Sequence, residues 1–285
     1  MLVSWKYRPR STVIQRLDPR ARLIYLACVI ASLTLLGIWD LRLILPLFLF
    51  NLSLYSMARI EWQDIGRAWL FILVLLVGIV GLNVLVGGRG GPASVLEDTS
   101  DPIVSIPLGW YTLQITAVRL FFAVTQLFRM LSMAILALMM PYTFDPNLYG
   151  VAFRCLGASD KVAFTMDLAL RFLPSFARDL STVVDAQRAR GYEVDNLKGG
   201  IPARLLRLAP LLVPVTMRSI LTGEEVIDAM ELRAFGVAPR TWLTQLRFTT
   251  QDDVLMGIGL GLIGLFGILR FGFGLGGFWM PEGLR

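Results

Sequence analysis

Long apolar runs alternate with short polar turns along most of the chain. Four runs lie at about residues 22–39, 41–57, 68–86 and 118–140, and a fifth lies at about 254–279. A helix needs about 20 mostly apolar residues to cross the hydrocarbon core of a bilayer, and somewhat fewer at the short end of the range. The pattern therefore predicts an all-α polytopic membrane protein with about five transmembrane helices.

The stretch from about 141 to 253 has a different pattern, because charged residues recur every few positions and acids nearly balance bases. It predicts two long amphipathic helices, at about 160–190 and 203–234, with a loop at 192–202 between them. Three prolines fall inside these helices and are expected to kink or interrupt them. They are Pro174 in the first helix and Pro210 and Pro214 in the second.

Charge sets the expected orientation in the membrane. The first 22 residues hold one acid, Asp18, and the cations Lys6, Arg8, Arg10, Arg16, Arg20 and Arg22. Cytoplasmic segments are rich in Lys and Arg, so the N-terminus is predicted to be cytoplasmic. Five spans would then place the C-terminus on the outer side of the cell membrane. The predicted parts are a cytosolic tail with the first four spans (1–140), a cytosolic coupling-helix region (141–253), and a glycine-rich last transmembrane helix with the C-terminus (254–285). Residues 87–112 are expected to form a flexible outer loop.

Composition excludes several classes of function. With 55% hydrophobic and 17% charged residues, the chain is too apolar for a soluble domain, so the net charge of +6 indicates cytoplasmic loops rather than nucleic-acid binding. The absence of histidine excludes histidine zinc sites and Ser-His-Asp triads. The glycine run at 87–92 lacks the Gly-Lys-Ser/Thr of a phosphate loop. Cys28 and Cys155 have no disulfide or metal spacing and are expected to be buried. No cofactor or metal is predicted.

Two features inside the predicted spans bear on packing or function. Arg129 lies near the middle of the fourth span and is expected to face the bundle interior, as a functional group or as a structural anchor. Its candidate partners are backbone carbonyls and the side chains of Asn51, Asn83 and Gln126. In the last span, Gly257 and Gly261 form a small-xxx-small pattern, which predicts either ordinary close packing of a neighbouring helix or a surface on which a partner membrane protein can slide.

A short stretch recurs near the ends of the two amphipathic helices. The first copy is Asp185-Ala186-Gln187-Arg188-Ala189-Arg190-Gly191, and the second is Asp228-Ala229-Met230-Glu231-Leu232-Arg233-Ala234-Phe235-Gly236. In each copy an alanine precedes an arginine by four positions, so the small side chain and the guanidinium share a helix face. One interpretation is a helix stop, with a cation in the last turn and a glycine as the left-handed cap. The repetition favours a paired docking device.

These motifs resemble those of the transmembrane T component of energy-coupling factor (ECF) transporters, the family that includes EcfT and the CbiQ-type cobalt permeases. The resemblance covers about residues 14–253. It rests on Leu17-Asp18-Pro19-Arg20 with Arg22-Leu23, on Leu170-Arg171-Phe172-Leu173-Pro174 leading to Ala189-Arg190-Gly191, and on the second copy with Arg240-Thr241 after it. The chain departs from the family at Gln15, where a histidine is common, and at Leu232-Arg233-Ala234, where Ala-Arg-Gly is expected.

The resemblance implies a transporter subunit that performs no catalysis itself. Two cytosolic ABC ATPase subunits would hydrolyse ATP, and a membrane S component would bind the transported vitamin or metal ion. The long cytosolic amphipathic helices would act as coupling helices between them. Arg190 and Arg233 would each enter a groove on one ATPase, and their neighbours in the contact would be Ala189, Gly191, Glu231, Leu232 and Ala234.

Two other classes of protein stay open from the residues alone. A polytopic membrane enzyme acting on lipid-linked substrates would use Arg129 with acids such as Asp167 and Asp179, but such enzymes usually cluster their carboxylates. Here the acids are scattered among bases. A self-sufficient channel or secondary transporter would leave the long amphipathic helices without a role.

Overall fold

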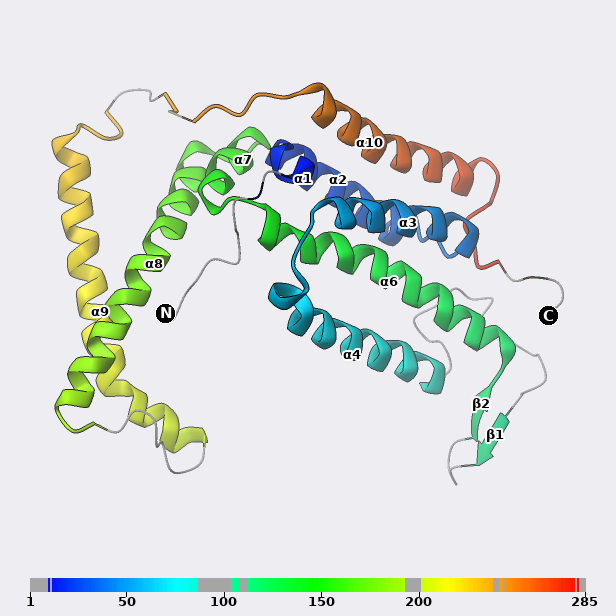
Figure 1. Ribbon diagram of the computed structural model, residues 1–285, viewed down its shortest axis with the longest axis horizontal. Helices are drawn as coiled ribbons and strands as arrows, with labels where there is room; N and C mark the ends of the chain where they lie inside the picture. The colour runs from blue at the N-terminus through cyan, green and yellow to red at the C-terminus, as the bar shows by residue number, and fades with distance from the viewer. Residues whose placement is uncertain are drawn as a thin grey trace. The chain divides into compact units, whose positions relative to one another are not determined.

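The computed structural model describes residue 10 and residues 12–86, 104–107, 112–192, 201–237, 241–242, 244–279 and 281. The chain divides into two compact units. One comprises Lys6–Asp145 with Arg247–Arg285 and is called the membrane bundle below, and the other comprises Pro146–Leu246 and is called the helical arm. Figure 1 labels the elements of both, and each unit is described by itself.

The membrane bundle is built from the predicted apolar runs. Its elements are α1 (Val13–Arg16), α2 (Pro19–Thr34), α3 (Leu41–Met57), α4 (Trp62–Val86), α6 (Ala117–Thr143) and α10 (Thr250–Phe271). Within the described residues, α4, α6 and α10 are each long and apolar enough to cross a membrane, and α3 is a shorter apolar helix of 17 residues. The helical class is therefore confirmed, and α2 is the shortest of the five helices on the predicted runs, at 16 residues.

The last predicted span ends earlier than its apolar sequence does. Helix α10 stops at Phe271, and Gly274 and Gly276 follow with φ of +64° and +99°, which a glycine adopts without steric cost. The chain then folds back, because the Trp39 backbone N–H donates to the Gly276 carbonyl at 2.7 Å and the ring of Phe278 packs on Phe122 near the start of α6. The prediction of one continuous span to residue 279 is wrong, since glycine turns interrupt it.

Part of the predicted flexible outer loop is ordered. Strands β1 (Val104–Pro107) and β2 (Thr112–Ile115) pair antiparallel, with Val104 opposite Ile115. The expectation of an unstructured loop is wrong for these residues, since backbone pairing fixes them. The other residues of 87–112 apart from Thr112 lie outside the described part of the chain.

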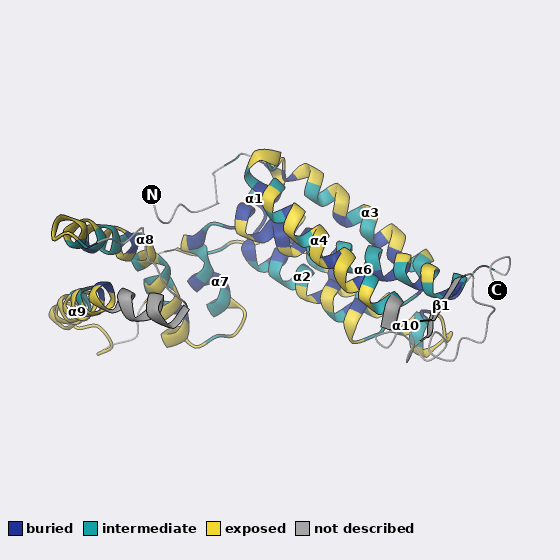
Figure 2. Cartoon of the chain, turned by 90° about the horizontal axis from the view of Figure 1, so that it is seen from below, coloured by how far each residue is buried: buried dark blue, intermediate teal, exposed yellow. Residues whose placement is uncertain are grey.

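Helix α2 contributes Ala21, Tyr25, Val29 and Leu33 to the largest group of buried apolar residues in the bundle. Figure 2 shows dark blue buried positions concentrated on the inner faces of the bundle helices. Gly259 of α10 makes the close approach to α2, because a Cβ added there would lie 3.3 Å from the Tyr25 ring and 3.4 Å from Cys28 Cβ. A Cβ on Gly257 or Gly261 would meet nothing within 4 Å. The prediction that Gly257 and Gly261 pack on a helix of this bundle is therefore wrong, since Gly259 makes the contact with α2 instead. Contact of these two glycines with a partner membrane protein stays a prediction.

A buried polar chain joins three helices inside the bundle. The Tyr25 hydroxyl of α2 donates to Asn51 Oδ1 of α3 at 2.6 Å, and Asn51 Nδ2 donates to Ser132 Oγ of α6 at 2.7 Å. Each of these residues is at most 2% exposed. Buried polar groups in an apolar medium require such partners, so the chain fixes the relative register of α2, α3 and α6.

The helical arm contains a short 3-10 turn η1 (Pro146–Leu148), α7 (Tyr149–Cys155), α8 (Asp160–Ala189) and α9 (Ile201–Leu232). The two long helices agree with the predicted amphipathic helices to within two residues at each end. Pro174, Pro210 and Pro214 lie inside them, and none of the three breaks its helix. Cys28 is buried as predicted, whereas Cys155 at the end of α7 is exposed, contrary to the prediction, because α7 ends at the surface of the arm.

Candidate functional site: two arginine-bearing helix ends

The first repeated stretch forms the C-terminal end of α8. The Gly191 N–H donates to the Arg188 carbonyl at 2.9 Å, and the Tyr192 N–H donates to the Gln187 carbonyl at 2.9 Å. Gly191 has a φ of +81°. These bonds define a Schellman motif, in which the residue before the left-handed glycine is the C-cap of the helix. Arg190 is that C-cap residue.

The second stretch repeats the same bonding at the end of α9. The Ala234 N–H donates to the Glu231 carbonyl at 2.8 Å, and the Phe235 N–H donates to the Met230 carbonyl at 2.9 Å. Ala234 takes the left-handed position with a φ of +51°. Arg233 therefore occupies the position equivalent to Arg190. The expectation that a glycine caps both helices is wrong for the second, since Ala234 takes the left-handed position and Gly236 lies two residues after it.

Both arginines lie on exposed helix ends. Ala186, Ala189 and Arg190 are exposed in the first copy, and Ala229, Leu232 and Arg233 are exposed in the second. Leu232 is 89% exposed, which is unusual for a large apolar side chain. Each end thus presents one guanidinium beside a small alanine side chain, which leaves the helix surface next to the arginine open to a partner.

Helices α8 and α9 form an antiparallel pair. The ring of Phe164 near the start of α8 lies 4.6 Å from that of Phe235 beyond the end of α9. Asp179 accepts from Arg218 at 2.9 Å farther along α8. Val183 is then buried with Leu211 and Val215, toward the start of α9. These contacts run from the start toward the end of α8 and from the end toward the start of α9. The two arginine-bearing ends therefore lie at opposite ends of the pair (Figure 1).

The predicted N-terminal motif, Leu17-Asp18-Pro19-Arg20, lies in the membrane bundle and joins α2 to α10. The Asp18 carboxylate caps α2 by accepting from the Arg20 N–H at 2.9 Å, and Pro19 is the first helical residue. Arg20 Nη2 also donates to Asp18 Oδ2 at 2.8 Å, and the guanidinium lies 3.9 Å from the Phe248 ring centre. Leu17, the first residue of the motif, is buried in the core.

A residue that the sequence reading missed completes this joint. Asp252 in the first turn of α10 is fully buried, and its Oδ1 accepts from the Asp18 N–H at 2.6 Å. Its Oδ2 accepts from the Thr249 N–H at 2.8 Å, which forms a capping box. A Thr-x-x-Asp pattern before an apolar run is the sequence signal that identifies such a cap.

Arg129 of α6 is held by backbone and aromatic contacts. Its Nη2 donates to the Leu33 carbonyl near the end of α2, and its guanidinium lies 4.0 Å from the Trp39 ring centre. A cation at a helix C-terminus satisfies unpaired carbonyls, which supports the structural-anchor alternative. Asn51, one of the predicted side-chain partners, bonds to Tyr25 and Ser132 instead.

Arg22 is a buried arginine whose structural role the sequence did not predict. It is 4% exposed, and its Nη1 donates to the Thr143 carbonyl at 3.0 Å, so the start of α2 is joined to the end of α6. Among the described residues, no group of three or more His, Cys, Asp or Glu is placed to hold a metal ion.

Comparisons with known proteins agree over most of the chain. A family model described as CbiQ, cobalt transport protein, matches residues 10–242. An energy-coupling factor transporter transmembrane protein EcfT from Ruminiclostridium cellulolyticum is 24% identical over 89% of this chain and 91% of its own length. EcfT proteins from Exiguobacterium sibiricum and Lacticaseibacillus paracasei are 26% and 27% identical over 95% and 94% of this chain, and over 100% and 98% of their own lengths.

The matched range includes both arginine-bearing helix ends and the N-terminal motif. Family and relatives indicate a transmembrane subunit of a transporter, which performs no catalysis itself, so the interpretation as a membrane enzyme is wrong. The chain belongs to the CbiQ cobalt transport protein family and is a membrane-embedded transmembrane component of the ECF transporter type.

Proposed function

We propose that this chain couples two cytosolic ATPase subunits to a membrane S component that binds a vitamin or metal ion for import. Names of relatives as ECF transporter transmembrane proteins support this role. In this proposal the N-terminus is cytoplasmic, the helical arm lies in the cytosol and the chain crosses the cell membrane several times.

The single observation that carries the proposal is the repeated arginine geometry. Arg190 and Arg233 occupy the same C-cap position of two Schellman motifs. From the register of α8 and α9 at Phe164 and Phe235, the two ends lie on the order of 35 to 40 Å apart, at 1.5 Å of rise per residue. Two equivalent docking ends separated by this distance fit two similar partner subunits rather than one.

The chemistry of each end fits an acidic groove on an ATPase. An arginine can donate two parallel hydrogen bonds to a carboxylate, and a hydrogen bond to a charged group contributes about 1.5 to 3 kcal/mol. The exposed alanine four residues earlier, Ala186 or Ala229, allows a groove wall to approach the helix closely. Loss of either arginine is therefore expected to weaken assembly, and loss of both to abolish it.

The test is a pull-down of the tagged full chain in detergent with its candidate ATPase pair. The variants are Arg190→Glu, Arg233→Glu and both together. Arg178→Glu is the matched control, because Arg178 is exposed on α8 but lies away from its end. We expect each single reversal to reduce ATPase recovery by about tenfold or more, the effect of losing roughly 1.4 kcal/mol, and the control to bind like the wild type.

Two results would contradict the proposal. One is equal recovery of the ATPases with the wild type, the double reversal and the control, all correctly inserted in the membrane. The other is substrate uptake by the purified chain alone in vesicles, which would identify a self-sufficient transporter.

A further inference from the structure

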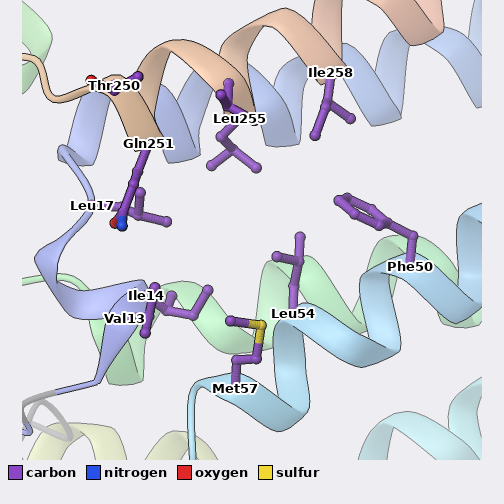
Figure 3. Close-up of a pocket in the computed structure, with 11 residues that line it drawn as sticks. Val13, Ile14, Leu17, Phe50, Leu54, Met57, Thr250, Gln251, Leu255 and Ile258 are labelled. Atoms are coloured by element: carbon purple, nitrogen blue, oxygen red, sulfur yellow. The ribbon is translucent and has the colours of Figure 1, made fainter.

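An apolar groove lies in the membrane bundle between α1, α3 and α10 (Figure 3). Its volume is about 290 Å³. A water molecule occupies roughly 30 Å³ in the liquid, and a methylene group is of similar size. The groove therefore has room for about ten methylene groups. Phe50 and Leu54 of α3 line one wall, and Leu255 and Ile258 of α10 line the other. Water finds few hydrogen-bond partners on such apolar walls, so an apolar group is the favoured occupant.

The groove is polar at one end only. Thr250 and Gln251, in the first turn of α10, line this end, and Figure 3 shows the Gln251 amide pointing toward Leu17. Phe50 and Ile258 close the opposite end. From residue 250 to 258 a helix rises about 12 Å. The groove therefore has the polarity of an amphiphile, with a polar head at the start of α10 and a tail running along the helix.

Two cations flank the polar end. Arg16 is adjacent in sequence to Leu17, and Arg247 precedes Thr250 by three residues, so chain length keeps each within about 11 Å of the groove wall. Both arginines are exposed. Asp253 in the first turn of α10 is exposed as well, so the exposed arginines exceed the exposed acid by one charge at this end, which is complementary to an anionic head group.

The groove opens toward the surroundings of the bundle. Val254 on the α10 wall is 57% exposed, and Met57 on the α3 wall is 45% exposed. In a membrane, large apolar side chains exposed on spanning helices face lipid, and a lipid tail in the groove would bury them further.

We propose that this groove binds one anionic phospholipid. An acyl chain lies between α3 and α10, the Gln251 amide donates to an ester or phosphate oxygen, and Arg16 and Arg247 neutralise the phosphate. Bound this way, the lipid fills the space between α1, α3 and α10 and stabilises the end of the bundle where α10 begins. The site does not depend on the ATPase contacts proposed above.

The test uses the full chain in nanodiscs of phosphatidylcholine containing a minor share of phosphatidylglycerol, with native mass spectrometry of the released protein. Leu54→Trp fills the groove, and Leu49→Trp is its control, since Leu49 lies on α3 outside the groove and is 53% exposed. Arg16→Gln with Arg247→Gln removes the cations, and Arg67→Gln on α4 is the control for an exposed arginine.

We expect the wild type and both controls to retain one phosphatidylglycerol in preference to phosphatidylcholine. Leu54→Trp should lose it, and the arginine variants should lose the preference by about fivefold per cation, the effect of one basic residue near an anionic surface. A phosphatidylglycerol with a photoactivatable acyl chain should label peptides of α3 and α10 in the wild type, which keeps the test valid if Leu54→Trp misfolds.

Several results would overturn the proposal. They are retention of the lipid by a folded Leu54→Trp at the wild-type level, equal retention of the two lipids by the wild type, and photolabelling confined to helices outside the groove. Loss of a copurifying membrane protein from Leu54→Trp without loss of lipid would likewise overturn it, and would identify the groove as a protein interface.

Discussion

Arg190 and Arg233 are equivalent in backbone geometry, but the residues after them are not. Gly191 takes its left-handed conformation without steric cost, whereas Ala234 takes the same conformation with a Cβ that crowds the following carbonyl. For residues other than glycine this conformation costs roughly 1 to 2 kcal/mol. The end of α9 is therefore held less firmly than the end of α8, and the two docking ends differ in stiffness.

Replacing Ala234 by glycine should strengthen the end of α9. We expect a gain of up to about 1 kcal/mol, because the relief of strain exceeds the entropy that glycine adds to the unfolded chain. Hydrogen exchange at the Arg233 and Phe235 amides should slow by up to about fivefold. The reciprocal variant Gly191→Ala should accelerate exchange at Tyr192, since its Cβ would meet no neighbour and only the backbone cost would act. Unchanged exchange in both variants would show that the caps are not strained.

At the scale of elements, α2 and α10 form the most closely joined pair in the bundle. Their first turns share the Asp18 to Asp252 hydrogen bond, and about two turns farther along Gly259 packs on Tyr25 and Cys28. The cap fixes where the two helices meet along their axes, and the glycine fixes how closely they approach. Lipid tails are as apolar as the helix surfaces, so no hydrophobic effect drives two helices together within the bilayer. Association there depends on close van der Waals packing, which small residues allow.

Gly259→Leu should separate the two helices. Overfilling a packed contact costs about 1 to 3 kcal/mol, so the melting temperature of the detergent-solubilised protein should fall by several degrees. Gly257→Leu and Gly261→Leu add the same side chain where a Cβ would meet nothing within 4 Å and should melt like the wild type. Destabilisation by these two variants, with Gly259→Leu unaffected, would restore the small-xxx-small interpretation.

At the scale of the whole molecule, the proposed function requires the helical arm to be cytoplasmic and the segment after α10 to be on the outer side. Two residues mark these sides. Cys155 is exposed in the helical arm, and Leu275, beyond the end of α10, is 46% exposed. Cys28 is buried and should contribute little background.

A membrane-impermeant maleimide therefore distinguishes the two sides. In intact cells it should leave Cys155 unmodified, and it should modify Cys155 once the membrane is opened, because only then does the reagent reach the cytoplasmic face. In a Cys155→Ser background, Leu275→Cys should react in intact cells. Gel-shift of the labelled protein provides the readout. Modification of Cys155 in intact cells would place the helical arm outside and exclude contact with cytosolic ATPases.

Local sequence patterns were enough to predict the helical class, the five apolar runs, the two amphipathic helices and the pair of helix ends that carry Arg190 and Arg233. These features depend on local properties: hydrophobic period, run length, and residues that begin or end a helix within one turn. The cap at Asp18 and Pro19 was predictable for the same reason.

The contacts between distant residues could be identified from the folded structure alone. Asp252 receives the N–H of Asp18 from the other end of the chain, and Gly259 faces α2 while the glycines of the recognisable motif do not. The turn that ends α10 at Phe271 and the left-handed Ala234 also departed from the apolar and glycine patterns. These features depend on which face of a helix packs against its neighbour, or on a strained backbone conformation that contacts elsewhere in the fold maintain. A short stretch of sequence does not specify either property.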